Sequence, residues 1–475
     1  YKAAARLARE EGTVVILRLT THVCHAKAKV AFEGWDPVPP DDSARFDPAN
    51  GPYIPIASLV FPMKAQALDR LEKVRAYAEA TPLNRFERRG GRRGIITTGL
   101  TALSAESVLA EADVEPPPDL LKLALSHPLA RETVLDFLKK HEEVFVLEEL
   151  DNLMELEVKA LAYDAGLGTK ILGKFDDEAW MGEYTPDKVR RLLHQAWPDL
   201  VPAADPPAPI PVPERPAQMC PGCGHRSAFH AIKAALDEKD ITVADIGCHT
   251  LGFLPPYEMG QLLMCMGAST GMGSGLGLFN TSRRVVAFMG DSTFFHAGLP
   301  GLVNALFNRH NLTLILMENG TTAMTGHQDH AASGRNFNTD TTGIPLRSVL
   351  EGLGVEAIFE VDTYQQAELG RLLGEALAVE GFSVVIARHP CMLKFTRRQR
   401  RKPSYTLRQV SLDQEACVQS HDCVARFACP SFVRQADGRV DVNSDLCIGD
   451  GSCRQTCPTS AIAKPQVKAV KEEGS

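Results

Sequence analysis

Two apolar segments of the sequence end in polar residues that can bind a divalent cation and a diphosphate. VVAFMGDS has the composition of a buried strand ending at Gly290 and Asp291, and LTLILMEN that of a second strand ending at Asn319, 28 residues after Asp291. Carboxyl ends of parallel strands meet at one sheet edge, where a carboxylate, an amide carbonyl and a backbone carbonyl suit Mg²⁺. Gly290 would let the backbone approach phosphates, and a helix starting at Leu299 would direct its amide groups toward the anion. Alternatively, Asp291 caps a helix and Asn319 forms a turn.

Four cysteines in the same region form a second group that could bind a metal ion or a cluster. Cys220 and Cys223 lie in CPGC ahead of a helical segment, Cys248 ends the strand-like ITVADIGC, and Cys391 follows SVVIARHP. Four thiolates at one edge of a sheet could hold Zn²⁺ or a [4Fe–4S] cluster, and spacing alone does not choose between them. The alternative is a tight CPGC turn with the other two cysteines buried as small apolar residues.

Six more cysteines occur near the C-terminus in two runs, CVQSHDCVARFACP and LCIGDGSCRQTCP. Two-cluster ferredoxins take three ligands of each cluster from one run and the fourth from the other run. The first ligand set is then Cys417, Ser420, Cys423 and Cys457, and the second is Cys447, Asp450, Cys453 and Cys429. Each set therefore contains three thiolates and one oxygen side chain at the same ordinal position.

The oxygen residues indicate tuned clusters rather than decayed ones, because both runs retain their CP cysteine. Three thiolates suffice for [3Fe–4S], and a carboxylate can be a hard, labile ligand to a fourth iron. A serine hydroxyl resists ionisation, so we expect the Asp450 set, rather than the Ser420 set, to hold four irons. Zinc binding is the rival interpretation, although this spacing is not that of a zinc ribbon.

Composition excludes several classes of protein. The chain has 475 residues, 44% of them hydrophobic and 23% charged, which is globular usage with length for about three domains. The net charge of −8 suggests neither nucleic acid nor an anionic membrane as a partner. No apolar run approaches the ~20 residues that span a bilayer. Ten of the twelve cysteines are grouped as in metal-binding proteins, whereas Cys24 and Cys265 stand apart, so we expect a cytoplasmic protein.

The elements that must position these residues are predicted from hydrophobic periodicity. A helix over 2–11 is expected to precede a short buried strand over 14–19, and an amphipathic helix over 64–79 to precede an α/β unit near 90–200. The Pro-rich stretch 197–217 is expected to be a linker. From 218 to 391, short apolar strands alternate with helices, which predicts a doubly wound parallel sheet.

The order of the motifs resembles a known family. CPGCGHR, DIGCHTLG, MGASTGMGSGLGL, GDSTFFHAG and ENGTTAMTGHQ are similar to the thiamine-binding region of 2-oxoacid:ferredoxin oxidoreductases. GTTAMTGHQ followed by a ferredoxin module resembles the large (alpha) subunits of the indolepyruvate:ferredoxin branch. VVILRLTTHVCHAKAKV and RGIITTGLTALSAESVL extend this resemblance over nearly the whole chain.

The resemblance implies roles for individual residues. Mg²⁺ would be bound by Asp291, Asn319 and the backbone of Thr321. The cluster nearest the thiazolium ring would be ligated by Cys220, Cys223, Cys248 and Cys391. The candidate catalytic residues are His225 and His327. The residues expected to bind thiamine diphosphate are Gly247, Cys248, His249, Gly267, Gly290, Asp291, Ser292, Asn319, Thr321, Ala323, Met324 and Thr325.

The implied activity is oxidative decarboxylation of aryl 2-oxoacids to aryl-acetyl-CoA, with electrons passing through up to three [4Fe–4S] or [3Fe–4S] clusters to ferredoxin. A small beta subunit is the expected partner, in a homo-oligomer of heterodimers. Two other classes share part of this evidence: a non-oxidative thiamine decarboxylase and a non-catalytic iron–sulfur electron-transfer subunit. The basic runs RFERRGGRRG and FTRRQRRKP could dock coenzyme A phosphates or an acidic electron acceptor, or be solvated loops.

The resemblance also implies a domain order. Because the chain opens without methionine, as if near the end of a domain, we expect the cofactor-activating glutamate upstream of residue 1. The fold class expected is multidomain α/β with a C-terminal α+β two-cluster ferredoxin-like module. The expected parts are 1–60, the end of a pyrimidine-binding-type α/β domain; 61–200, a transketolase-C-like domain; 201–217, a linker; 218–394, the thiamine diphosphate-binding domain; 395–410, a basic connector; and 411–475, the iron–sulfur domain.

Overall fold

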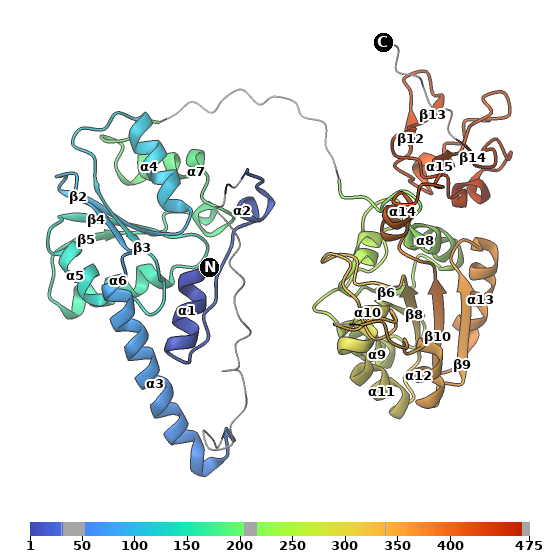
Figure 1. Ribbon diagram of the computed structural model, residues 1–475, viewed down its shortest axis with the longest axis horizontal. Helices are drawn as coiled ribbons and strands as arrows, with labels where there is room; N and C mark the ends of the chain where they lie inside the picture. The colour runs from blue at the N-terminus through green and yellow to red at the C-terminus, as the bar shows by residue number, and fades with distance from the viewer. Residues whose placement is uncertain (30, 32–52, 204–215, 338, 468–475) are drawn as a thin grey trace. The chain divides into compact units, whose positions relative to one another are not determined.

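The computed structural model describes residues 1–29, 31, 53–203, 216–337 and 339–467, and it divides the chain into two compact units, 1–211 and 212–475 (Figure 1). The division falls within the Pro-rich stretch 197–217. In the described part of the chain, no helix combines the length and the apolar character needed to cross a bilayer.

The first unit is built on a five-stranded sheet in the order β1-β3-β2-β4-β5. β1 pairs antiparallel with β3, and the other pairs are parallel. The strands are β1 (Arg85–Glu87), β2 (Arg93–Thr98), β3 (Asp119–Leu123), β4 (Glu143–Leu147) and β5 (Lys170–Leu172). Ile95 and Ile96 of β2 are both buried, but in different cores on opposite faces of the sheet.

Helices cover both faces of this sheet. One face packs against α3 (Ala57–Ala80), α5 (Arg131–Leu138) and α6 (Leu153–Asp164), and the other against α4 (Thr101–Glu111) and α7 (Pro186–Ala196). The amphipathic helix and the strands at RGIITT and EVFVL were predicted, and the structure confirms them.

The predicted strand at 14–19 is wrong. The helix α1 (Lys2–Glu10) forms, but the residues after it have no regular structure until α2 (Thr21–His25), and Val14 and Ile16 are each 88% exposed. An apolar run becomes a strand only when a neighbour completes its hydrogen-bond ladder, and no strand among the described residues pairs with this one.

The second unit has a fully parallel sheet in the order β6-β7-β8-β10-β9, which confirms the predicted fold class. The strands are β6 (Ile241–Val243), β7 (Val285–Gly290), β8 (Leu312–Glu318), β9 (Ala357–Asp362) and β10 (Phe382–Arg388). Alternate residues of each strand enter different cores: Val286 and Phe288 of β7 lie in one, and Val285 and Ala287 in the other.

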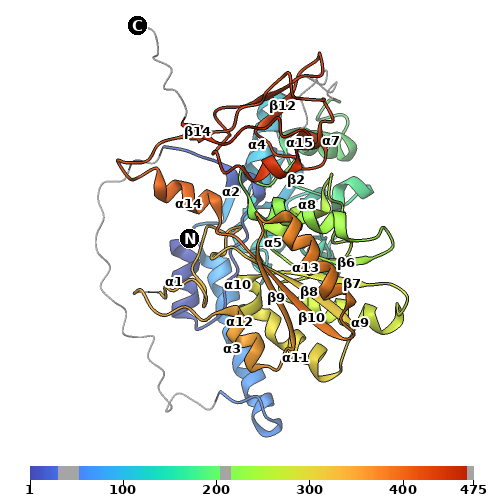
Figure 2. The same cartoon turned by 90° about the vertical axis from the view of Figure 1, so that its right-hand side faces the viewer.

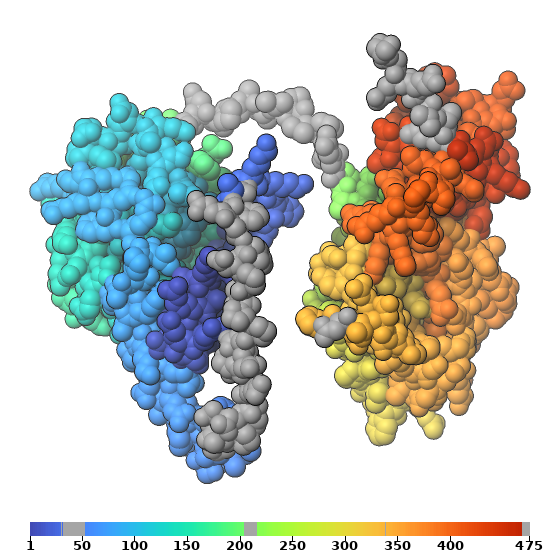
Figure 3. Space-filling model, viewed as in Figure 1, coloured from blue at the N-terminus to red at the C-terminus, as the bar shows by residue number. Residues whose placement is uncertain are grey.

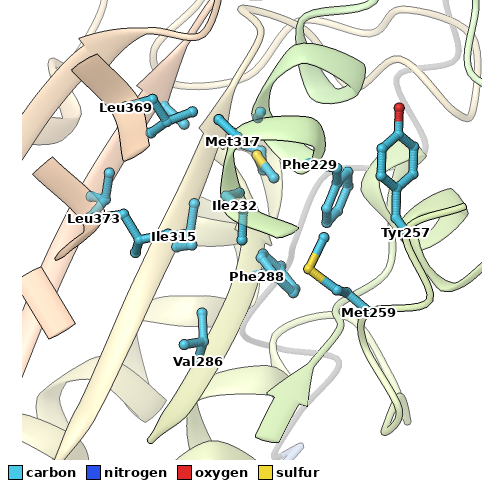
Figure 4. Packing of buried hydrophobic residues seen from close by; sticks show 14 of the residues in the cluster. Phe229, Ile232, Tyr257, Met259, Val286, Phe288, Ile315, Met317, Leu369 and Leu373 are labelled. Carbon is cyan, nitrogen blue, oxygen red and sulfur yellow. The ribbon is translucent and has the colours of Figure 1, made fainter. Parts of the chain in front are cut away.

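The two cores are covered by different helices. Figure 4 shows the first, where Phe229 and Ile232 of α8 (Gly224–Ala235) and Leu369 and Leu373 of α13 (Gln366–Ala378) surround the strand side chains. The second core packs against α9 (Ala268–Phe279), α11 (Leu299–Phe307) and α12 (Leu346–Gly352). This arrangement leaves the carboxyl ends of the strands free of core helices.

The strand register aligns the three central strand ends. Gly290 lies opposite Met317, and Glu318 lies opposite Arg388. The residues that follow, Asp291, Asn319 and His389, therefore emerge at one edge of the sheet, as the sequence predicted for the first two.

The C-terminal module contains short strand pairs and little helix. β11 (Arg408–Gln409) pairs with β14 (Gln466–Val467), and β12 (Phe432–Arg434) pairs with β13 (Val440–Val442). Its helices are α15 (Asp422–Ala425) and a 3₁₀ helix, Ser452–Thr456. Cys429, Cys447 and Cys453 are buried in its small core beside Phe427. The predicted basic connector begins as a helix, α14 (Met392–Gln399), which lies on the near face of the unit in Figure 3.

Candidate cofactor site

Asp291 is the central residue of the predicted cation site. Its side chain is buried, and its carboxylate accepts hydrogen bonds from the backbone of Ser292 (2.8 Å), Asn319 (2.9 Å) and Gly320 (2.7 Å). The last two bonds connect the end of β7 to the loop after β8. Asp291 therefore does more than cap a helix: its carboxylate holds the two strand ends together.

Asn319 supplies the second oxygen. Its side-chain carbonyl accepts a 3.0 Å hydrogen bond from the backbone of Thr321, so the turn that was the alternative interpretation is present. An amide or carboxylate oxygen has two lone pairs, so this bond leaves one available for a metal. The set of carboxylate, amide and backbone oxygens at one edge fits Mg²⁺ in chemical type.

The helical segment at this edge starts earlier than predicted. The turn α10 (Asp291–Thr293) follows Gly290 directly, and it continues through a π-helical turn (Phe294–Gly298) into α11. The expectation that the amides near an anion belong to a helix starting at Leu299 is therefore wrong. Gly290, in extended backbone, is the residue before the first turn, so the first amide groups of the helical segment lie next to Asp291 instead.

Two residues at the site were missed by sequence reasoning. Asp245 is fully buried, and its carboxylate accepts from the backbone of Ile246 (2.8 Å), Gly267 (2.8 Å) and Ser269 (3.1 Å), which fixes the start of α9. His330 lies with Nε2 3.4 Å from an Asp291 carboxylate oxygen. Asp245 follows an apolar strand, as Asp291 does, and that signal could have identified it. No local pattern marks His330.

Gly247 and Gly267 have steric reasons to be glycine. A Cβ on Gly247 would lie 2.5 Å from the His249 ring, and one on Gly267 would lie 2.6 Å from the Ala297 carbonyl oxygen. Gly267 also has φ +90°, which an L side chain rarely adopts.

The predicted histidines His225 and His249 are buried and close together. Their ring centroids are 6.1 Å apart, and Asn319 Nδ2 lies 3.3 Å from His225 Nε2. Burial, reinforced by His249 and opposed by Asp291, lowers the pKa of His225 to about 3, and burial lowers the pKa of His249 to about 4 despite Asp291. Both rings are neutral at pH 7, and His249 Nε2 is buried without a hydrogen-bond partner.

One cavity brings together two groups predicted separately. All four cysteines of the first set, Cys220, Cys223, Cys248 and Cys391, line it. Asn319, His225, Ala323 and His327 line the same cavity. The thiols thus gather beside the predicted cation site. Burial, partly offset by Arg226, raises the pKa of Cys223 to about 12, so these thiols suit a site in which a metal displaces the proton.

The other predicted loop residues are less enclosed. His327, at φ +67°, places Nε2 3.6 Å from Cys391 Sγ, and partial burial with nearby Arg397 and Lys394 lowers its pKa. Met324 and Thr325 are exposed, and the Thr325 hydroxyl donates to Gln328 within the loop. The structure does not connect these two to Asp291.

The C-terminal cysteines group as the interleaved ferredoxin pattern predicts. A second cavity is lined by Cys417, Ser420, Cys423 and Cys457, together with neighbouring residues. Burial first, and then Cys417 and Cys457, raise the pKa of Cys423 to about 11. The pKa of Cys453 is raised by burial, Asp450, Cys429 and Cys447, in that order, which are its predicted companions. Asp450 Oδ1 accepts from the Ser452 backbone at 2.9 Å.

The cysteines of the described residues form no disulfide. In the same residues, no group of three or more His, Cys, Asp or Glu side chains forms a site for a single metal ion. A cluster of several irons spreads its thiolates more widely than one tetrahedral ion does. The individual ligand sets stay predictions.

Comparisons with known proteins agree with this layout. The family model for the thiamine pyrophosphate enzyme C-terminal TPP-binding domain matches residues 245–387, and the model for the 4Fe-4S binding domain matches residues 440–463. These ranges contain Asp291 and Asp450, respectively.

Two curated relatives and one solved structure are among the matches. The chain is 34% identical to indolepyruvate oxidoreductase subunit IorA of Methanothermobacter marburgensis, over 98% of the chain and 74% of that relative. It is 32% identical to the subunit of the same name from Archaeoglobus fulgidus, over 96% of the chain and 73% of the relative. The structure of 2-oxoglutarate:ferredoxin oxidoreductase from Magnetococcus marinus matches at 20% identity and a TM-score of 0.35, over 39% of the chain and 71% of that structure.

Proposed function

The chain belongs to the family of indolepyruvate oxidoreductase IorA subunits, and on this premise we propose that its substrates are aryl 2-oxoacids and its product is an aryl-acetyl-CoA. The wider reaction class is that of a thiamine pyrophosphate-dependent 2-oxoacid:ferredoxin oxidoreductase. In the balanced reaction, one 2-oxoacid anion and coenzyme A give CO₂, the acyl thioester and one proton, and the two electrons released reduce ferredoxin.

One observation carries the proposal: a single cavity is lined by both Asn319 of the predicted cation site and the four cysteines of the first set. Thiamine diphosphate supplies the electron sink for decarboxylation when it is bound. Its diphosphate and Mg²⁺ would be held by Asp291, Asn319 and the backbone of Thr321. An electron acceptor next to that site distinguishes an oxidative enzyme from a simple decarboxylase.

The surrounding side chains have defined tasks in this proposal. His225 is neutral and lies against the Asn319 amide, so it can hold that amide with its oxygen toward a cation. Lys394 Nζ donates to the Thr321 hydroxyl at 3.1 Å, which brings a positive charge to the anion site. The buried Asp245 fixes the turn that contains Gly267.

The C-terminal module would carry electrons from this site toward the external acceptor. We assign Cys447, Asp450, Cys453 and Cys429 to a [4Fe–4S] cluster with a labile carboxylate ligand. Cys417, Ser420, Cys423 and Cys457 are assigned to a second cluster, which three thiolates would support as [3Fe–4S].

The proposed partners follow from this assignment. They are a small beta subunit, ferredoxin or a similar acceptor, and coenzyme A, in a homo-oligomer of heterodimers located in the cytoplasm. The basic residues of α14 are exposed on the unit that carries the cavity, and they are candidates for the coenzyme A phosphates.

The test is an anaerobic preparation of the chain with its small subunit, assayed for thiamine diphosphate, iron and 2-oxoacid turnover. We expect both cofactors, and ferredoxin reduction that depends on coenzyme A and is faster with indolepyruvate, phenylpyruvate or 4-hydroxyphenylpyruvate than with 2-oxoglutarate. Thiamine diphosphate without iron would favour a non-oxidative decarboxylase. Iron without thiamine diphosphate would favour an electron-transfer subunit.

The Asp450 assignment has its own test. A carboxylate binds iron more weakly than a thiolate does, so mild ferricyanide should release one iron and produce a [3Fe–4S] signal in paramagnetic resonance. The variant Asp450→Cys should retain that iron, and Cys417→Ala removes the overlapping signal of the Ser420 set. Identical spectra and iron content in wild type and Asp450→Cys would show that Asp450 is not a ligand.

A further inference from the structure

Arg226 is a buried cation at the junction of the parallel-sheet domain and the C-terminal module. It lies in the first turn of α8 and is only 2% exposed. Figure 1 shows the module packed on the end of the domain that carries α8 and α14. The Arg226 guanidinium donates to the backbone carbonyls of Met219, on its own side, and of Phe427 (3.2 Å) and Ala428, on the module.

These carbonyls belong to two different ligand loops. Met219 immediately precedes Cys220, and Ala428 immediately precedes Cys429. The Arg226 backbone N–H also donates to the Cys223 carbonyl at 3.1 Å. One side chain therefore links the loop of the first cysteine set to the loop that supplies the cross-paired ligand of the Asp450 set.

The Asp450 loop approaches the same CPGC turn from another side. A Cβ on Gly222, between the two CPGC cysteines, would lie 2.4 Å from the Ile448 side chain and 3.1 Å from Asp450 Oδ2. Tyr364 donates its hydroxyl to the Gly222 carbonyl at 2.7 Å. The loop that carries Asp450 therefore lies against the CPGC turn that carries two cysteines of the first set.

The charge of Arg226 has no carboxylate to balance it. Among the described residues, no Asp or Glu lies within ion-pair distance of its guanidinium, and its Nε is buried without a hydrogen-bond partner. The hydroxyl of Tyr257 points away from the core in Figure 4 and donates to Phe427 O at 2.8 Å, so it competes for one of the same carbonyls. A buried, unpaired cation is costly unless an anion lies nearby.

We propose that Arg226 is the shared counter-charge of two neighbouring iron–sulfur clusters, one held by the first cysteine set and one by the Asp450 set. Thiolate-ligated clusters are anionic and gain another negative charge on reduction. A fixed cation in the low-dielectric interface between the domain and the C-terminal module therefore stabilises the reduced form of each cluster and raises both reduction potentials. Arg226 is a positioning residue that would also keep the two ligand loops together. This inference rests on the ligand sets of the proposed function.

The test is a redox titration of the anaerobic holoenzyme, monitored by paramagnetic resonance, with iron content measured on each sample. Arg226→Met should lower the reduced-to-oxidised ratio of both clusters about tenfold at a fixed potential, which is ~59 mV for a one-electron couple. Arg226→Lys keeps the charge and should stay within about threefold of wild type. Cys220→Ala and Cys453→Ala assign the two signals.

Two further variants control for structure. Arg371→Met removes a positive charge from the exposed face of α13, where Arg371 pairs with Glu368, and should leave both ratios unchanged. Arg226→Gln is neutral but can still donate to carbonyls, and it replaces Arg226→Met in the comparison if the latter does not fold.

The outcomes separate this inference from the proposed function. If both clusters are present and the neutral variants leave both ratios unchanged, the inference is overturned while the ligand sets stand. Equal shifts in Arg226→Lys and the neutral variants would also overturn it, because they would point to geometry rather than charge. A wild-type enzyme that lacks either cluster would overturn the ligand sets themselves.

Discussion

Each of the two five-stranded sheets of this chain has a carboxylate held by backbone amides at the end of a strand, but the two carboxylates differ in the cation that lies beside them. In the first unit, Glu148 follows β4, and its carboxylate accepts from the backbone of Met154 (2.9 Å) and Glu155 (3.0 Å) at the start of α6. In the second, Asp291 follows β7 and accepts from backbone amides of the neighbouring loop. Each is a carboxylate at the carboxyl end of a parallel strand, and each accepts from two backbone amides of the loop or helix start that it contacts; Asp291 also accepts from Ser292.

The difference is the cation that accompanies each carboxylate. In the first unit, Lys174 donates to the Glu148 backbone carbonyl and to the Tyr184 hydroxyl (2.7 Å), and its charge partly offsets the burial that raises the pKa of Glu148. In the second, the described residue within ion-pair distance of Asp291 is His330. A protein cation closes the first site, whereas no lysine or arginine of the described residues lies within ion-pair distance of Asp291. This difference supports the proposal that Asp291, rather than Glu148, holds a metal cation.

Neutralising each of the two carboxylates in turn should give the largest difference, which is in cofactor affinity. Asp291→Asn keeps the shape but removes the charged ligand, so we expect at least ~100-fold weaker binding of thiamine diphosphate with Mg²⁺. Glu148→Gln should change this affinity by less than about threefold. Calorimetric titration measures both, with circular dichroism to verify folding. Equal affinities in the two variants would refute the assignment of the cation site.

The cysteines beside the second sheet provide the next test of the comparison. Cys220→Ala should lose one cluster, about four irons per chain, while it retains thiamine diphosphate. The matched control is Cys265→Ala, because Cys265 is exposed and belongs to no predicted set. Iron and thiamine assays on anaerobic samples make the measurement. Unchanged iron in Cys220→Ala would remove Cys220 from the ligand set.

The closed site of the first unit should contribute stability rather than binding. Lys174→Met leaves buried carbonyls unpaired and Glu148 without its cation, so we expect a loss of ~2 kcal/mol in the free energy of unfolding. All three tryptophans lie within residues 1–211, so tryptophan fluorescence follows this unit selectively during urea unfolding. Thiamine diphosphate affinity should not change. A stability equal to wild type would mean that Lys174 does not close the site.

The smallest effect concerns Asp176, a surface carboxylate of the first unit. Arg191 and Gln195 donate to it at 2.6 and 2.9 Å, and these bonds lower its pKa to about 2. Its folded pKa lies below the unfolded value of ~3.9, so the stabilisation is present above pH ~4 and disappears as the pH falls toward 2. Because the carboxylate is 34% exposed and screened by solvent, we expect at most ~1 kcal/mol.

The measurement is urea unfolding of wild type and Asp176→Asn by tryptophan fluorescence at pH 7 and at pH 2.5. Wild type should have the larger free energy of unfolding at pH 7, and its advantage over Asp176→Asn should be smaller at pH 2.5. A difference that grew on acidification would contradict the sign derived from the pKa.

The sequence predicted β2, β4, β6, β7, β8 and β10 but missed β1, β3, β5 and β9. β7, β8 and β10 are continuous apolar runs because helices cover them on both faces. β9 is only partly buried over most of its length and includes Glu360, and β5 has three residues, so neither carries a strong hydrophobic signal. The run at 14–19 shows the converse, since apolar composition without a pairing partner produced no strand.

The sequence by itself determined the residue types at the strand ends and the order of the cysteine motifs, and these were sufficient to predict a cofactor site at one sheet edge and to propose groups of cysteines. Only the tertiary structure decided which charged side chains lie against these strand ends and cysteine loops. Arg226 meets Phe427 from 201 positions away, and His330 reaches Asp291 from a separate loop. Local patterns report burial and backbone geometry, which depend on neighbours in sequence. The partner of a buried charge depends on where distant segments meet, and only the folded chain specifies that.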